Sequence, residues 1–191
     1  MRPRYSALSI IWGIQFVIKK NAVRFVSCIG IFMVWLSVGQ AISQEMPVPA
    51  EMQASLFKKI FAYDKKLSLE AEIKVVVAFA DSSAGMKDEI VKAFQGAGIS
   101  AKALKMDQLP GNLGDVSAIY LTSGSGPVKS VCQKSQILSI TGIPSLVESG
   151  AAAIGLGISE SKPKIVIHLG ELKAEGHEVS AKLLQLAKVI N

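Results

Sequence analysis

Blocks of apolar residues change their spacing along the chain, and this change separates predicted helices from predicted strands. Between residues 50 and 67 apolar side chains recur three and four positions apart, which predicts an amphipathic helix. Residues 73–80 read IKVVVAFA, a continuous β-branched run that predicts a strand buried on both faces. A helical pattern returns over residues 86–95, and Gly96 and Gly98 predict its end.

The rest of the chain continues this alternation of strands and helices. Further strands are expected at residues 99–106, 116–121, 136–140, 152–158 and 164–169. Further helices are expected at residues 128–134, 144–150, 170–176 and 180–188, the last one capped by Ser180. This pattern predicts an α/β fold, a single domain with a mainly parallel sheet flanked by helices. The short spacing between the last two strands predicts a hairpin strand pair near the C-terminus.

The first 43 residues have a different composition from the rest. They contain five basic residues and no Asp or Glu, and residues 25–38 form an uncharged apolar run. Small residues follow at Gly39 and Ala41, a pattern typical of a secretory signal peptide. The run is shorter than the ~20 residues that span a bilayer. We expect a cleaved signal peptide at residues 1–41, or cleavage after Ser43, and a domain at 42–191 that does not span a membrane.

Removal of the leader changes the charge of the protein. From Gln44 onward the chain has 16 Lys, no Arg and 15 acidic residues, a net charge of 16 − 15 = +1. Arg is the usual reader of phosphates and bases, so no nucleic-acid partner is predicted. Cys132 is then the one cysteine left, and it cannot form an internal disulfide. We expect it to be a small buried hydrophobe, with a reactive or intermolecular thiol as the alternative.

Candidate ligand-binding residues follow the predicted strands. Ligands of parallel sheets bind outside the carboxyl ends of the strands, and three short polar loops follow strands there. Their candidate binding residues are Asp81, Ser82, Thr122, Ser123, Ser125 and Thr141. The loop at 122–126 resembles a phosphate cradle, but it has neither the GxxxxGK[ST] nor the GxGxxG spacing. The alternative is that these residues cap helices and turn the chain.

Catalytic and metal sites are not predicted. No motif assigns a base to any nucleophile, so an enzyme hypothesis is limited to a dispersed hydrolase site around Asp81 and the nearby serines. His168 and His177 have no third nitrogen or sulfur ligand near them in the sequence. We expect His168 to be packed or at an edge, and His177 to be solvated between Glu175 and Glu178. No metal and no cofactor are predicted.

Several segments resemble one known family. They are SLFKKIFAYDKKL at 55–67, LSIT at 138–141, IVIHL at 165–169 and VSAKLL at 179–184. Together they resemble the YfiR/HmsC-like family of small secreted bacterial proteins. The chain departs from the family pattern at Gly150-Ala151 in place of a glycine pair, at His168 in place of Asn, and in its lone Cys132 in place of cysteine pairs.

The resemblance implies a function as well as a fold. It implies a periplasmic regulator and not an enzyme. Such a protein binds the periplasmic part of a membrane-anchored signalling protein, a diguanylate cyclase, and represses it. By the same analogy we expect a homodimer. The polar loops at the strand ends support an alternative function, a periplasmic module that binds a small molecule or an anion.

Overall fold

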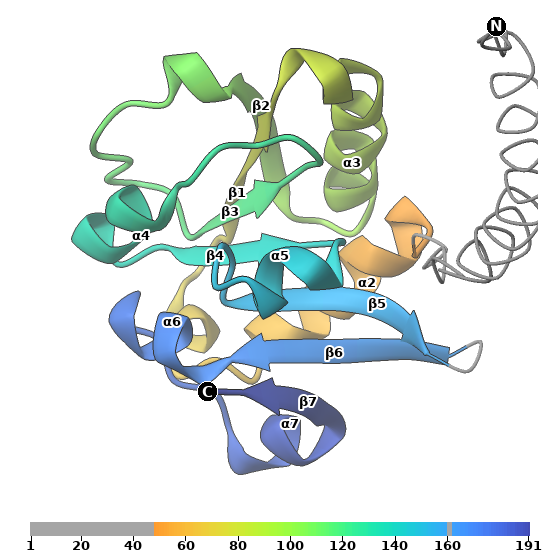
Figure 1. Ribbon diagram of the computed structural model, residues 1–191, viewed down its shortest axis with the longest axis vertical. Coiled ribbons are helices and arrows are strands. Elements are labelled where there is room, and N and C mark those ends of the chain that lie inside the picture. The colour runs from red at the N-terminus through yellow and green to blue at the C-terminus, as the bar shows by residue number, and fades with distance from the viewer. Residues whose placement is uncertain (1–47, 160–161) are drawn as a thin grey trace, which may run out of the picture. The chain divides into compact units, whose positions relative to one another are not determined.

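The computed structural model describes residues 48–159 and 162–191, all of which belong to one compact unit, Glu45–Asn191. The signal peptide predicted at residues 1–41 lies outside the described residues. The unit is built on a seven-stranded sheet (Figure 1). Its strands are β1 (Lys74–Phe79), β2 (Ser100–Lys105), β3 (Ala118–Leu121), β4 (Leu138–Thr141), β5 (Ile154–Ser159), β6 (Lys162–His168) and β7 (Ala187–Ile190).

The strand order is β2-β1-β3-β4-β5-β6-β7. The pairs among β2, β1, β3, β4 and β5 are all parallel, whereas β5 and β6 form an antiparallel pair and β7 lies parallel to β6. The predictions of an α/β fold, a mainly parallel sheet and a C-terminal hairpin are therefore confirmed. The order 2-1-3-4-5 is that of a doubly wound sheet, in which the order of strand addition reverses between β1 and β3.

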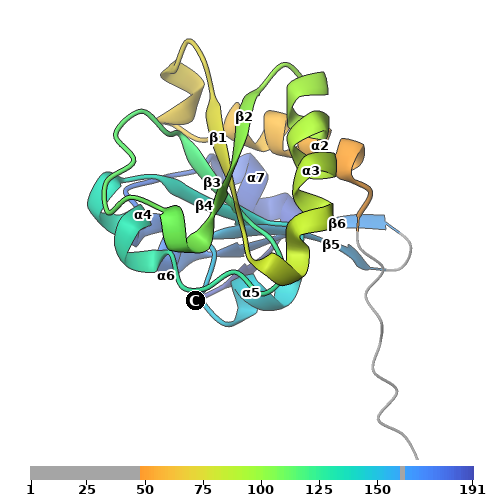
Figure 2. The same ribbon diagram turned by 90° about the horizontal axis from the view of Figure 1, so that it is seen from above.

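Helices cover both faces of the sheet. They are α2 (Ala50–Phe61), α3 (Ala84–Gly96), α4 (Lys129–Ser135), α5 (Pro144–Glu148), α6 (Leu169–Ala174) and α7 (Ala181–Leu186). Figure 2 shows α2 and α7 on one side of the strands and α4 and α5 on the other. Two hydrophobic clusters follow this division, one beneath α2, α3 and α7 and a smaller one beneath α4 and α5.

Aromatic packing joins α2 and α3 to the sheet. Phe57 and Phe61 of α2 and Phe94 of α3 are buried, and Phe57 and Phe94 each contact Tyr120 of β3 edge-on. Ring centroids in these contacts lie 5.8–6.2 Å apart, within the range favoured by aromatic pairs. In β1, residues 75–78 are buried as the continuous apolar run predicted. These contacts fix α3, and with it the loop that precedes it, against the centre of the sheet.

Two segments near the helix ends differ from the prediction. The first helix was expected to reach residue 67 but ends at Phe61, because Asp64 forms a β-bridge with Val179 and its carboxylate accepts N–H bonds from Lys66 and Leu67. The closing helix was expected to reach residue 188 but ends at Leu186. Residues 187–190 instead form β7 beside β6, because sheet pairing outweighs the helical spacing in this β-branched segment.

Candidate functional site

The loops that carry the predicted ligand-binding residues lie at one edge of the sheet. The loop after β1 contains Asp81 and Ser82 and enters a short 3-10 helix, Asp81–Ser83. The loop after β3 is tied to it, since Ser83 Oγ lies 2.8 Å from Thr122 Oγ1. These two loops flank the point where the strand order reverses, which is where doubly wound sheets bind ligands. Thr141 ends β4, the next strand in the sheet.

The buried and half-buried hydroxyls of this edge form hydrogen bonds with the protein itself. Thr122 Oγ1 and Ser125 Oγ both donate to the carbonyl of Ala78, at 3.0 and 2.9 Å. Thr141 Oγ1 donates to the carbonyl of Leu121 and accepts from the amide of Ile143. Thr122 and Thr141 are fully buried. These three hydroxyls therefore close the loops onto the strands.

The exposed groups of the edge are Asp81, Ser82 and Ser123. The Asp81 side chain is 82% exposed and pairs with Lys105 at 2.9 Å. The hydrogen bond to Asp81, together with the nearby Asp107 carboxylate, raises the pKa of Lys105. The structure thus brings all six candidates to one edge of the sheet: three are exposed, Ser125 is half-buried, and Thr122 and Thr141 are buried. Their role in binding stays a prediction.

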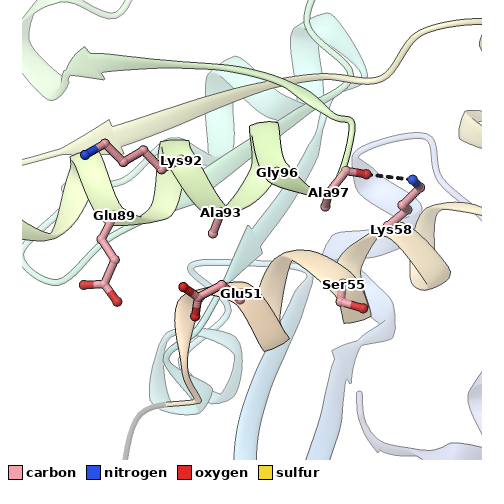
Figure 3. Close-up of a pocket in the computed structure, with 8 residues that line it drawn as sticks. All are labelled: Glu51, Ser55, Lys58, Glu89, Lys92, Ala93, Gly96 and Ala97. Atoms are coloured by element: carbon pink, nitrogen blue, oxygen red, sulfur yellow. Dashed lines mark hydrogen bonds between the residues drawn. The ribbon is translucent and has the colours of Figure 1, made fainter.

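A groove of about 620 Å³ lies between α2 and α3 (Figure 3). Glu51 and Glu89 extend their carboxylates on one side of it, and at the other end Lys58 Nζ donates to the carbonyl of Ala97 at 2.6 Å. The groove contains none of the six predicted residues. Its lining residues are Glu51, Ser55, Lys58, Glu89, Lys92, Ala93, Gly96 and Ala97.

A second polar cluster is buried where α2, α4 and α6 end, and the sequence did not predict it. Asp64 and His177 form a buried pair, with Oδ2 and Nδ1 3.0 Å apart and both side chains 0% exposed. The other ring nitrogen of His177 lies 3.2 Å from the carbonyl of Gln136. Gln136 is the one residue other than glycine with positive φ among those described, at 52°. The prediction that His177 is solvated is therefore wrong.

Two acidic residues of α6 and its C-cap extend this cluster. Glu175 is 1% exposed and accepts hydrogen bonds from the backbone amide and the hydroxyl of Ser139. Burial outweighs these two hydrogen bonds and raises the pKa of Glu175 to about 7. Glu171 is also buried and pairs with the half-exposed Lys129 at the start of α4.

An Asp–His pair is part of many acyl-transfer sites, but this one is not arranged for catalysis. A general base needs a free ring nitrogen within reach of the nucleophile, and both nitrogens of His177 have protein partners. Both side chains are closed to solvent. Across residues 48–159 and 162–191, no three His, Cys, Asp or Glu side chains are grouped to hold a metal ion. The cluster is a closed hydrogen-bond network that ties three segments of the chain together.

The remaining sequence-predicted positions have simple structural roles. His168 is partly exposed, and its Nδ1 accepts the amide of Glu171 as the N-cap of α6. Cys132 is fully buried, which confirms the prediction of a small core residue, and burial raises its pKa. No residue spacing signalled the Asp64–His177 pair, because its partners are far apart in the sequence and meet only through the sheet.

Comparison with solved structures supports the class of fold. An ABC domain from Streptococcus pneumonia, solved in complex with L-Trp, has a TM-score of 0.54 and 14% identity over 74% of this chain. A conserved domain protein from Vibrio cholerae has a TM-score of 0.54 and 14% identity over 77% of this chain. The chain spans about three fifths of each, 60% and 61%. A comparison with curated proteins gives no significant match.

The fold and its loops thus define a doubly wound α/β domain. Within that class the chain belongs to the YfiR/HmsC-like family, whose pattern it matches over residues 53–188. This match confirms the resemblance noted in the sequence. In general terms, the family supports a periplasmic regulator of the cyclic-di-GMP system. None of the helices in the described part of the chain has the length and apolar character needed to cross a membrane.

Proposed function

We propose that this protein is exported and then regulates a signalling protein of the inner membrane from the periplasmic side. The partner is a diguanylate cyclase, which the protein represses by binding its periplasmic part. The observation that carries the proposal is the family match over residues 53–188, most of the domain. The charge pattern of residues 1–43 supports export through a cleaved signal peptide.

The physical requirement for such repression is a differential affinity. A protein that binds the inactive state of the cyclase more tightly than the active state shifts the population by that difference. This needs an exposed surface more than a catalytic pocket. Several large apolar side chains are exposed on the described part of the domain: Met52, Leu69, Met86, Leu186 and Val189.

Deletion and complementation test this function. Deleting the gene should raise cellular cyclic-di-GMP, and the full chain supplied in trans should lower it again. A matched control lacks residues 1–41, so it stays in the cytosol and should not complement. Cross-linking in membrane preparations should recover an inner-membrane cyclase bound to the protein when the full chain is expressed, but not when the control is expressed. Unchanged cyclic-di-GMP in the deletion strain would contradict the proposal.

A homodimer is part of the proposal, by analogy with the family. Sedimentation velocity of the purified protein across a hundredfold concentration range would measure it. A single species at the mass of one domain at every concentration would contradict it.

A second candidate function is the binding of a small molecule or an anion. Its support is the position of Asp81, Ser82, Thr122, Ser123, Ser125 and Thr141 beside the reversal of strand order. A ligand present at 100 times its dissociation constant stabilises a protein by about 2.7 kcal/mol, which a thermal-shift screen detects. We expect any such shift to disappear in Ser82→Ala combined with Ser123→Ala, because both side chains are exposed. A shift that survives this double change would place the ligand elsewhere, such as the groove between α2 and α3.

A further inference from the structure

His177 joins three segments that are distant in the sequence. It lies in the loop between α6 and α7, and its ring contacts Asp64 after α2 and Gln136 before β4. The two contacts use the two different ring nitrogens, Nδ1 and Nε2. The chemistry of the partners therefore determines how many protons the ring carries.

Both partners are hydrogen-bond acceptors. A backbone carbonyl can only accept, so Nε2 must donate to Gln136. The other oxygen of Asp64 accepts amide hydrogens from Lys66 and Leu67, each at 2.9 Å, as an ionised carboxylate does. Nδ1 must then donate as well, which makes His177 an imidazolium. If the shared proton sat on Asp64 instead, the pair would still hold one proton more than a neutral histidine beside an ionised aspartate.

Charged and titratable groups surround the ring on several sides. Burial alone would raise the pKa of Asp64, but the hydrogen bond and charge of His177 and the two backbone amides hold it below its usual value. Glu175 faces the pair from the end of α6, with Glu171 beyond it. On the opposite side Lys66 Nζ also donates to the carbonyl of Gln136, at 2.6 Å. At the surface Lys65 pairs with Glu178.

We call the contacts of His177 with Asp64 and Gln136 the junction. Two main-chain hydrogen bonds lie beside it. The amide of Lys65 donates to the carbonyl of Glu178 at 2.8 Å, and the amide of Ser180 donates to the carbonyl of Tyr63 at 2.9 Å. Ser180 is the N-cap of α7, which leads directly into β7, the edge strand of the sheet. The junction thus connects the end of α2 to the α7–β7 edge.

We propose that this junction is a proton-dependent latch. With the extra proton, His177 donates to both Asp64 and Gln136 and holds the α6–α7 loop against the end of α2. When the proton leaves as pH rises, one of the two hydrogen bonds is lost and the α7–β7 edge opens more readily. The latch goes beyond the proposed function, because it does not depend on which partner the protein binds.

The protonation state can be measured directly, because the sequence contains only two histidines. Nitrogen-15 spectra of the purified, untagged protein at pH 5.5 should show both ring nitrogens of His177 carrying a hydrogen. His168 serves as the internal comparison, since its Nδ1 accepts a hydrogen bond. A neutral His177 ring at pH 5.5 beside an unprotonated Asp64 would overturn the proposal.

Hydrogen exchange tests the latch itself. Between pH 5.5 and 8.5 the protection of the Lys65 and Ser180 amides should fall by about tenfold or more relative to core amides of β1 and β3, because a charged hydrogen bond is lost. His177→Gln should remove this pH step, and the matched variant His168→Gln should keep it. Glu175→Gln should also keep it, which separates His177 from the other group that titrates nearby. A step that persists in His177→Gln or vanishes in Glu175→Gln would overturn the latch, as would wild-type protection that follows the core amides.

Discussion

Glu175 is a carboxylic acid almost closed to water, and its burial makes stability depend on pH. Its pKa is raised to about 7 in the folded protein from an ordinary 4.5. The folded state therefore holds this proton more tightly than the unfolded state does. The stabilisation is complete below pH 4.5 and is lost as the pH rises through about 7.

We expect Glu175→Gln to reduce this pH dependence. Gln keeps the side chain neutral, so the stability of the variant relative to wild type should increase by on the order of 3 kcal/mol between pH 4.5 and pH 7.5. Urea unfolding at several pH values measures the difference, with Glu148→Gln at the surface as the control. An unchanged difference between the two proteins across this range would contradict the prediction.

Asp64 gives the opposite pH dependence. Its pKa lies below the usual value, because the hydrogen bonds and charge of its partners outweigh burial. Its stabilisation is present above about pH 3.8 and is lost as pH falls through the lower folded value. Asp64→Asn leaves a buried His177 without its counter-charge, and removal of one partner of such a pair costs about 3–5 kcal/mol.

The measurement is denaturant unfolding of Asp64→Asn at pH 7. Asp88→Asn is the matched control, because Asp88 pairs with Lys87 at the surface and its side chain is 67% exposed. The control should change stability by less than about 0.5 kcal/mol. Equal effects of the two substitutions would show that the buried pair contributes little.

At the scale of elements, the buried hydroxyl of Thr122 and the hydroxyl of Ser125 hold the loop after β3 against β1. Thr122 Oγ1 donates to Ala78 and lies near the hydroxyls of Ser83 and Ser125. Thr122→Val keeps the shape but leaves these groups with one partner fewer, so we expect a loss of about 1–3 kcal/mol. Ser123 lies in the same loop and is exposed, so Ser123→Ala should change the free energy of unfolding by less than about 0.5 kcal/mol. If Thr122→Val left the free energy of unfolding unchanged, the Thr122 hydroxyl would not hold the loop, and a role in ligand binding would be favoured instead.

The contact between α5 and β5 depends on a glycine with no space for a side chain. A Cβ added at Gly155 would lie 2.5 Å from Val147 Cγ2, and Val147 is fully buried in α5. Gly155→Ala should therefore push α5 from the sheet and cost about 1–3 kcal/mol. Gly85→Ala in α3 is the control, because nothing lies within 4 Å of its added Cβ, and we expect it to be neutral or slightly stabilising. Thermal unfolding of both variants decides this, and equal midpoints would contradict it.

The elements also show what the sequence could and could not predict. Continuous apolar runs such as residues 73–80 need burial on both faces, so the parallel sheet followed from them directly. The closing helix was predicted to run through residue 188 because the apolar spacing fits one, and only the neighbouring β6 turns residues 187–190 into a strand. The loop candidates could be placed at one edge by topology alone. The Asp64–His177 pair could not, because it depends on side-chain contacts across 113 positions.

At the scale of the whole molecule, the two hydrophobic clusters are separated by a single continuous sheet, so opening one face should require loss of the fold. Cys132 lies in the cluster beneath α4 and α5, is fully buried, and has a raised pKa. Its thiolate is therefore both inaccessible and disfavoured in the folded protein. With Cys28 replaced by serine or removed with the leader, Cys132 reports on this cluster alone.

We expect the Cys132 thiol to react with a disulfide reagent only when the whole domain unfolds. The free energy derived from its reaction rate at increasing urea should then equal the global free energy of unfolding from circular dichroism, because no smaller opening exposes it. Val131→Ala, on the partly buried side of α4, is a control that should lower both free energies equally. Rapid reaction in the absence of urea would instead show that α4 detaches from the sheet by itself, and that the face beneath it opens while the α2, α3 and α7 face stays folded.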